Sequence, residues 1–221
     1  MERRLSRGAL WTLAAASAVC ALMIAARIGY TGRLTYYWLF MPNLLLAWIP
    51  LIASRLVGRS LNGKARPGAA AWAWGIVWLA FYPNASYIVT DLKHLAYLST
   101  ERSLYYDLSV NMLAALLGWL LGALSLLAIH AEVRERLGAA AGIAFAGIVI
   151  VLGSVGVYLG RVLRWNSWDL VVKPWRIVVD AADIVRDPQA LLFVLAFSLF
   201  GGAAYAVLYR LLAPSGRFTS T

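Results

Sequence analysis

Long apolar segments alternate with short polar ones along the whole chain. A helix of about 20 apolar residues crosses the roughly 30 Å hydrocarbon layer of a membrane, and it satisfies its own backbone hydrogen bonds there. We therefore predict an all-α, polytopic membrane helix bundle that forms a single integral membrane domain over residues 1–221. The six predicted transmembrane helices cover residues 8–26, 34–54, 69–90, 108–131, 137–160 and 191–208.

A different pattern lies between the fifth and sixth apolar segments. Apolar residues recur there at helical spacing, while charged residues such as Arg176 and Asp180 occupy the opposite side. Pro174 suits the first turn of a helix. The pattern predicts an amphipathic helix over residues 174–186 that lies in the membrane interface, because it is too polar to span the membrane.

The composition agrees with a membrane location. Hydrophobic residues make up 62% of the chain and charged residues only 14%, whereas a soluble domain carries about 25% charged residues. The net charge of +10 comes from basic residues beside apolar segments, where anionic lipid headgroups are nearer than nucleic acid. The single cysteine, Cys20, lies inside the first apolar segment, which argues against a disulfide framework or a thiolate metal site. We expect membrane lipids as partners, no nucleic acid and no cofactor.

The distribution of lysine and arginine predicts the orientation of the chain. The N-terminal segment and the second and fourth loops carry more basic residues than the first and third loops. Cytoplasmic loops are enriched in Lys and Arg, so both termini are predicted to be cytoplasmic. The fifth loop departs from this pattern because it holds several basic residues, and its arginines are therefore candidates for a functional role.

Polar residues gather where the first, third and fifth loops meet, which we call the odd-loop face. Because these loops share one side of the membrane, the segments after the third and fifth spans must face each other there. The third span and its continuation carry four polar residues with the spacing of one helix face: Asn84, Tyr87, Asp91 and His94. The competing interpretation is that Thr90 caps a new short helix, which would break this stripe.

Further polar residues point into the bundle near the same face. Asp107 and Asn111 lie four residues apart at the start of the fourth span, in line with Gly118, a small residue that favours close helix packing. The second and third spans each contain a Pro-Asn pair, which ends at Asn43 and at Asn84. Proline frees a carbonyl inside a helix, and polar groups at membrane depth usually face a bundle interior or a cavity. Hydrogen bonds between helices are the simplest interpretation of the asparagines.

The end of the fifth span supplies the basic part of the predicted site: Arg161, Arg164, Asn166 and Asp169. Arginine presents a planar fork of donors that suits phosphate or carboxylate. The three-residue spacing of the two arginines places them on one side of the helix end. The alternative is that these arginines snorkel beside interfacial tryptophans and only anchor the helix.

Asp91 and His94 are the candidate catalytic residues, as a general acid–base pair. The alternative is an interfacial helix start at which both hydrogen-bond locally. A metal site is not expected, since His94 is the only histidine on this face and metal sites usually have more nitrogen or sulfur donors. His130, beside Glu132 at the opposite face, is interpreted as a solvated helix end. The sequence has no P-loop, HExxH, CxxC or GxSxG motif, which argues against ATP-driven chemistry and zincin-type proteolysis.

Two segments of the sequence resemble the hallmark segments of a known family. They are residues 82–94 (YPNASYIVTDLKH) and 158–169 (YLGRVLRWNSWD). Both are similar to an uncharacterised bacterial family of predicted membrane proteins, catalogued as domain of unknown function 1361. The similarity covers most of the chain, including residues 38–50. The resemblance implies a multi-pass protein of the bacterial cytoplasmic membrane, and it supplies no activity or substrate.

The gathered polar residues predict a binding function at the odd-loop face. We expect the site to hold a lipid headgroup, a small anionic ligand or a partner subunit. The alternative is a small membrane enzyme for an anionic lipid-linked substrate, in which Arg161 and Arg164 hold the phosphate and His94 transfers protons. A transporter built from two inverted halves is a third hypothesis, although residues 8–90 and 108–208 show no convincing similarity to each other.

Overall fold

The computed structural model describes residues 6–32, 34–61, 66–94, 99, 103–166 and 169–212. All regular elements in these residues are helical, so the predicted all-α fold is confirmed there. The elements are α1 (Arg7–Thr31), α2 (Thr35–Leu61), α3 (Ala69–Tyr87), the 3-10 helix η1 (Ile88–His94), α5 (Leu104–Leu137), α6 (Ala139–Arg161), α7 (Asp169–Val172), α8 (Pro174–Asp183), the 3-10 helix η2 (Ile184–Arg186) and α9 (Pro188–Leu212).

Several helices have the properties of membrane spans. Five helices in the described part of the chain are long and apolar enough to cross a membrane, which supports a multi-pass membrane protein. They are Arg7–Thr31, Met41–Leu61, Leu104–Leu137, Ala139–Arg161 and Pro188–Leu212. The helix α3, which covers most of the predicted third span, is not among them, and its last turns hold Pro83, Asn84 and Ser86. The total of six spans therefore stays a prediction.

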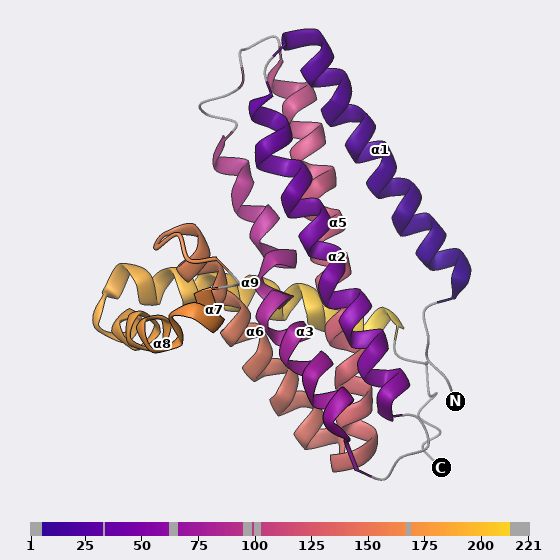
Figure 1. Cartoon of the computed structure of the whole chain (residues 1–221), viewed down its shortest axis with the longest axis vertical. Helices are drawn as coiled ribbons and strands as arrows, with labels where there is room; N and C mark the ends of the chain where they lie inside the picture. Colours follow the sequence, from indigo (N-terminus) through magenta and orange to yellow (C-terminus); the bar gives the residue numbers. More distant parts are fainter. Residues whose placement is uncertain are drawn as a thin grey trace, which may run out of the picture.

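The centre of the molecule is formed by α2 and α5, which run along its longest axis, with α3 packed against both (Figure 1). Apolar side chains that include Ile24, Leu51 and Leu121 fill the space between α1, α2 and α5. A second set, which includes Trp78 and Leu126, fills the space between α3, α5 and α6. In a membrane, helix association depends on such close packing rather than on the hydrophobic effect.

Glycine residues bring α3 close to α5 and α6. A Cβ atom on Gly118 of α5 would lie 2.6 Å from the carbonyl oxygen of Ala85. A Cβ atom on Gly156 of α6 would collide with the ring of Pro83. This geometry agrees with the predicted role of small residues in close helix packing. The close approach holds the C-terminal end of α3 between α5 and α6, where the polar residues lie.

The predicted amphipathic helix over residues 174–186 is present as α8 followed directly by η2. Ile177 and Ile184 are buried in a cluster with residues of α6 and α9. In contrast, Trp175 and Val185 are 73% and 72% exposed. The segment therefore carries apolar side chains on its outer surface as well, as an interfacial helix does. Its position in the membrane interface stays a prediction.

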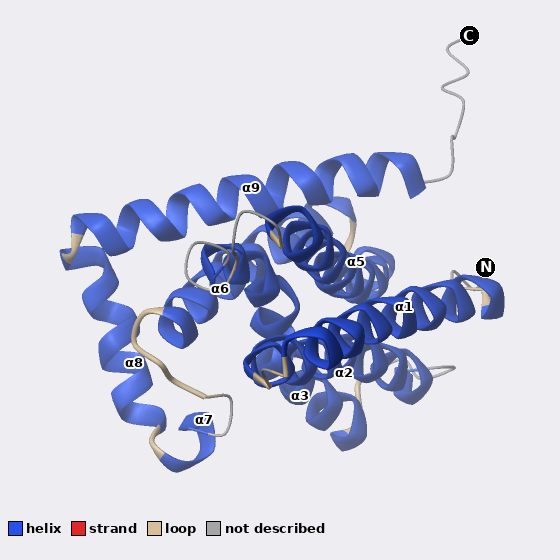
Figure 2. Cartoon of the chain, turned by 90° about the horizontal axis from the view of Figure 1, so that it is seen from above, coloured by secondary structure: helices blue, strands red, loops and turns tan. Residues whose placement is uncertain are grey.

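The last helix, α9, lies across the bundle instead of running along it (Figures 1 and 2). Figure 2 looks along the longest axis of the molecule, and α9 stretches across this view. Its main neighbours are α6 and η2. The hydrophobic pattern predicts that this helix exists, because length and composition are properties of the segment itself. Its direction depends on packing against α6, about which the pattern contains no information.

Candidate functional site

One buried carboxylate connects three elements near the odd-loop face. Asp91 of η1 forms an ion pair with Arg161, the last residue of α6, and their side chains are 1% and 10% exposed. The side-chain amide of Asn43 in α2 donates a hydrogen bond over 3.0 Å to the other oxygen of Asp91. Charge-assisted hydrogen bonds of this kind are about twice as strong as neutral ones. The Asp91 carboxylate is thereby bound by α2 and α6 at once.

Arg161 also contacts the end of α3 and the start of η1. Its Nε donates to the hydroxyl oxygen of Thr90 over 2.6 Å, and its Nη2 donates to the carbonyl oxygen of Tyr87 over 3.4 Å. The guanidinium carbon lies 3.9 Å from the centre of the Tyr87 ring, in a cation–π contact worth about 0.5–2 kcal/mol. We call these five residues the Asp91 cluster: Asn43, Tyr87, Thr90, Asp91 and Arg161.

The geometry of η1 explains why Asp91 points inward. The α-helix ends at Tyr87 and a 3-10 helix continues to His94, so the predicted α-helical stripe through residue 94 is wrong. The alternative is right that a new short helix follows, but this helix begins at Ile88, before Thr90. The Thr90 hydroxyl donates to the Tyr87 carbonyl, so Thr90 does not cap it. With three residues per turn, Ile88 and Asp91 lie on one line, and both are 1% exposed.

A second buried ion pair lies near the start of α5. Asp107 accepts two hydrogen bonds from Arg27 of α1, one from Nε over 2.6 Å and one from Nη2 over 3.0 Å. The two side chains are 0% and 8% exposed, and the Ser99 hydroxyl donates to the same carboxylate over 2.8 Å. Bidentate pairing of arginine with carboxylate adds geometric specificity as well as energy. The Arg27–Asp107 pair connects α1 to α5.

The predicted inward orientation of Asn111 is confirmed. The residue is buried one turn after Asp107 on α5, and its side-chain amide donates to the Asp107 carbonyl over 2.7 Å. Its amide oxygen has no hydrogen-bond partner in the part of the chain that the structure describes. Asn84 is partly buried on α3. Asn43 and Asn111 each donate a hydrogen bond to an aspartate residue.

Arg164 follows the end of α6 in an unusual backbone conformation. Its φ is 62°, and among the described residues it is the only one other than glycine with a positive φ. The Trp165 N–H donates to the Leu159 carbonyl over 3.1 Å, so the chain folds back onto the last turn of α6. The Trp165 indole donates to Asp180 of α8 over 2.7 Å. These two hydrogen bonds fix the turn that carries Arg164.

The side chain of Arg164 is exposed, three residues after Arg161 of the Asp91 cluster. Within the described ranges, no carboxylate lies at ion-pair distance from Arg164, whereas Arg161 is paired with Asp91. Of these two arginines, Arg161 is charge-balanced in the interior and Arg164 is exposed.

The structure brings together only part of the predicted site. Tyr87, Asp91 and Arg161 meet in the Asp91 cluster. Asp107 and Asn111 belong instead to the surroundings of the Arg27–Asp107 pair. The predicted site residues are thus divided between two buried groups. Asp91 pairs with Arg161 at the end of α6, whereas Asp107 pairs with Arg27 of α1.

Three further predicted residues do not join either group in the described structure. Asn166 and Asp169 form a local turn, in which the Asn166 N–H donates to the Asp169 carboxylate over 2.8 Å. The side chain of His94 lies outside the described residues. The acid–base hypothesis, which depends on that side chain, stays a prediction.

Arg27 is not among the candidate residues predicted from the sequence. A signal was present in the charges. Arg27 ends one apolar segment and Asp107 begins another at the same face, and a buried charge needs a partner. The Pro-Asn pattern, by contrast, did point to Asn43, which contacts Asp91.

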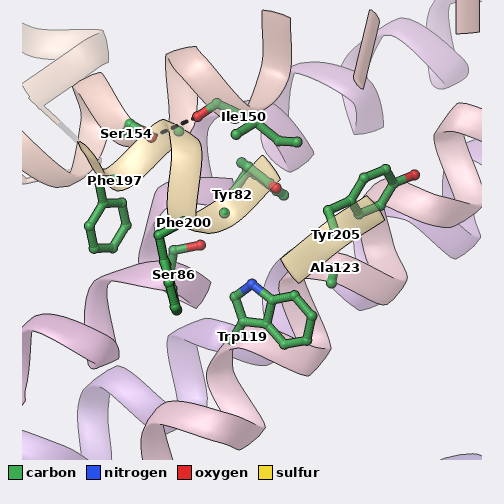
Figure 3. A pocket seen from close by; sticks show the side chains of 11 residues that line it. Tyr82, Ser86, Trp119, Ala123, Ile150, Ser154, Phe197, Phe200 and Tyr205 are labelled. Carbon is green, nitrogen blue, oxygen red and sulfur yellow. Dashed lines mark hydrogen bonds between the residues drawn. The ribbon is translucent and has the colours of Figure 1, made fainter. Parts of the chain in front are cut away.

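A small cavity lies between α3, α5, α6 and α9 (Figure 3). Its volume is about 20 Å³, and a water molecule needs about 10–15 Å³ together with polar partners. Tyr82, Ser86 and Tyr205 line it, and the Ser154 hydroxyl at its wall donates to the Ile150 carbonyl over 2.9 Å. The cavity has room for a water molecule and is too small for an organic ligand.

The interpretation of His130 as a solvated helix end is wrong. The residue is 2% exposed, and its Nδ1 lies 2.8 Å from the Tyr205 hydroxyl of α9. Its ring stacks on Tyr209 with 5.0 Å between the ring centres. Gly142 of α6 leaves the necessary room, since a Cβ atom there would lie 2.9 Å from Nε2 of His130. The covering helix α9 comes from a distant part of the sequence, so the local pattern around His130 does not show this burial.

Comparison with known proteins identifies the family. A sequence model of a family described as protein of unknown function (DUF1361) matches residues 42–202, so the chain belongs to this family. The match includes the whole Asp91 cluster and Arg164, whereas Arg27 lies outside it. No curated protein and no solved structure matches the chain. Since the family description gives no activity, the function has to be argued from the site.

Proposed function

We propose that this member of the DUF1361 family is a membrane protein that binds an anionic group at the odd-loop face. The ligand is the phosphate or carboxylate group of a membrane-associated molecule, and Arg164 binds it together with Arg161 of the Asp91 cluster. The observation that carries the proposal is the exposed Arg164, which is held in a left-handed conformation three residues after Arg161.

The backbone of Arg164 supports a role for its side chain. A left-handed conformation costs a residue other than glycine roughly 1–2 kcal/mol, whereas glycine adopts it readily. Stability alone would therefore favour glycine at this helix end. Strained backbone positions cluster at ligand sites, and the inference runs from the observed φ of 62° to the function.

The Asp91 cluster supports an anionic ligand because it already accommodates an anion. The Asp91 carboxylate takes its hydrogen bonds from a guanidinium and an amide, which are the donors that a phosphate or carboxylate ligand would use. A ligand anion that approaches the face meets the exposed Arg164 first. It then competes with Asp91 for Arg161, whose side chain is 10% exposed.

The contacts of Asp91 favour binding over acid–base catalysis. The guanidinium of Arg161 and the amide of Asn43 both stabilise the ionised carboxylate. A general acid needs its protonated form at the working pH, and these contacts oppose that form. The enzyme hypothesis then depends on His94, so we rank it second.

The proposal is tested by identifying the acidic molecules that co-purify with the protein in a mild detergent, using mass spectrometry. We expect an acidic species to remain bound to the wild-type protein and to be lost from Arg164→Gly. Glycine removes the guanidinium and suits the left-handed backbone, so this variant should gain about 1 kcal/mol in unfolding free energy when both proteins are free of ligand. Arg176→Ala, at an exposed position on α8, is the control and should retain the ligand.

Two results would count against the proposal. Equal amounts of the same acidic species from the wild type and from Arg164→Gly would show that the guanidinium does not bind it. A lower unfolding temperature of Arg164→Gly, measured after ligand has been removed from both proteins, would show that the side chain stabilises the fold and would give Arg164 a structural role.

A further inference from the structure

The helices α1 and α2 separate toward the N-terminal end of α1 (Figure 1). Between them lies an open groove with a volume of about 420 Å³. This volume falls in the range of about 300–1,000 Å³ that is typical of ligand sites. One wall of the groove comes from α1 and consists of Arg7, Leu10, Trp11 and Ala14.

The second wall repeats the pattern of the first in the opposite direction. It comes from α2 and consists of Trp48, Leu51, Ile52 and Arg55. In each wall the second, third and fourth residues follow the first by three, four and seven positions, which is the spacing of one helix face. The chain reverses direction between α1 and α2. Arg7, the first wall residue of α1, therefore lies at the same end of the groove as Arg55, the last wall residue of α2.

The groove is closed at its other end by a contact between the two helices. The Trp48 indole donates to the Ser17 hydroxyl of α1 over 3.2 Å. Its outer side is open, since Trp11 and Ile52 are 74% and 52% exposed. The groove is thus apolar along its length, closed at one end and flanked by two arginines at the other.

We propose that this groove binds one anionic phospholipid, with an acyl chain along the apolar walls and the phosphate between Arg7 and Arg55. Charge complementarity determines the choice of occupant. Guanidinium groups match phosphate oxygens in geometry and charge, and anionic headgroups are available beside the ends of membrane helices.

The packing of α1 gives the lipid a structural role. Only four of the 25 residues of α1 are buried against the rest of the protein. A phospholipid in the groove adds contacts to the N-terminal half of this helix. The site is separate from the Arg164 site, because the two lie at opposite ends of the helices, and it does not depend on that proposal.

The experiment uses delipidated full-length protein in a neutral detergent, titrated with phosphatidylglycerol or with phosphatidylcholine of the same acyl chains. Native mass spectrometry counts the bound lipids. We expect phosphatidylglycerol to bind more tightly, and we expect Arg7→Gln and Arg55→Gln each to weaken its binding roughly fivefold. Ala14→Trp fills the groove and should weaken the binding of both lipids.

Two matched controls separate the groove from the general surface. Arg59→Gln changes an exposed arginine one turn after Arg55 on α2, and Ala15→Trp changes the exposed neighbour of Ala14 on α1. Neither residue lines the groove, so neither variant should change the affinity. If Arg55→Gln does not fold, Arg7→Gln decides, because it alters an exposed residue at a helix start.

Several outcomes would overturn the site. Equal affinities for the two lipids would show that the site does not select the anionic headgroup. Equal losses of lipid affinity in the groove variants and the control variants would show that only the general surface charge attracts the lipid. A large gain in affinity after deletion of residues 2–5 would show that the chain's own N-terminal segment occupies the groove. Arg164→Gly should leave this binding unchanged, which keeps the outcome distinct from that of the odd-loop site.

Discussion

The two buried ion pairs of this protein have the same chemistry and different surroundings. Asp107 is 0% exposed and accepts a bidentate pair from Arg27 and a third hydrogen bond from Ser99. Asp91 is almost as deeply buried, but its partner Arg161 is 10% exposed. Three residues after Arg161 follows Arg164, whose side chain is exposed. The Arg27–Asp107 pair connects helices, whereas the Asp91 cluster also borders a surface that a ligand can reach.

A buried carboxylate does not by itself mark a binding site. When both partners are enclosed, a competing anion has no access, and removal of one partner leaves an uncompensated charge. When the arginine borders the surface, a ligand anion can take the place of the carboxylate at a lower cost in desolvation.

Asp107→Asn is expected to have the largest effect. It removes the negative charge that is paired with the buried Arg27 guanidinium, which costs about 3–5 kcal/mol of unfolding free energy. Thermal unfolding in detergent, followed by circular dichroism, measures the loss. The double variant Arg27→Met with Asp107→Leu should recover most of it, because apolar residues of similar size can replace a buried pair. If Asp107→Asn alone is as stable as the wild type, the Arg27–Asp107 pair does not stabilise the fold more than the Asp91–Arg161 pair does.

Asp91→Asn is expected to destabilise the protein less, by about 1.5–3 kcal/mol. Arg161 borders the surface and keeps its hydrogen bonds to Thr90 and Tyr87. The same change should increase the amount of acidic ligand that co-purifies, because it removes the carboxylate that competes for Arg161. A parallel loss of stability and ligand, as large as in Asp107→Asn, would show that the two pairs are equivalent.

Most helices could be predicted from the sequence, because a membrane restricts the length and composition of every span. The helix α6, Ala139–Arg161, agrees closely with the predicted span 137–160. The helix α5, Leu104–Leu137, extends beyond the predicted span 108–131 at both ends. A helix continues through polar residues outside the hydrocarbon layer, whereas the hydropathy pattern ends with the apolar residues.

The candidate site could be predicted only in its coarse position. Asp91 and Arg161 were placed on one face by the number of spans between them, which requires no knowledge of packing. The contact of Arg27 with Asp107 joins residues that are 80 positions apart, so no local pattern contains it. The change to a 3-10 helix at Ile88 accompanies the close approach of that residue to Gly118 of α5, which is equally non-local.

The smallest expected effect concerns the aromatic ring of Tyr87, which contacts Arg161 in the Asp91 cluster. Tyr87→Leu removes the ring face that lies 3.9 Å from the Arg161 guanidinium and should cost about 0.5–2 kcal/mol of unfolding free energy. Tyr87→Phe keeps that face, so it should stay within about 0.5 kcal/mol of the wild type. Thermal unfolding of the two variants measures the difference. Tyr105→Leu, at a residue that is 78% exposed on α5, is the control.

A second readout of the same variants separates a binding role from a structural one. The ring holds the Arg161 guanidinium in position between Asp91 and the exposed surface, so Tyr87→Leu should also reduce the retained acidic ligand, while Tyr87→Phe retains it. If both variants lose the same stability and the same ligand, the hydroxyl group matters and the cation–π contact does not. If Tyr87→Leu loses stability and keeps the ligand, the Asp91 cluster only connects helices, as the Arg27–Asp107 pair does, and the binding proposal then rests on Arg164 alone.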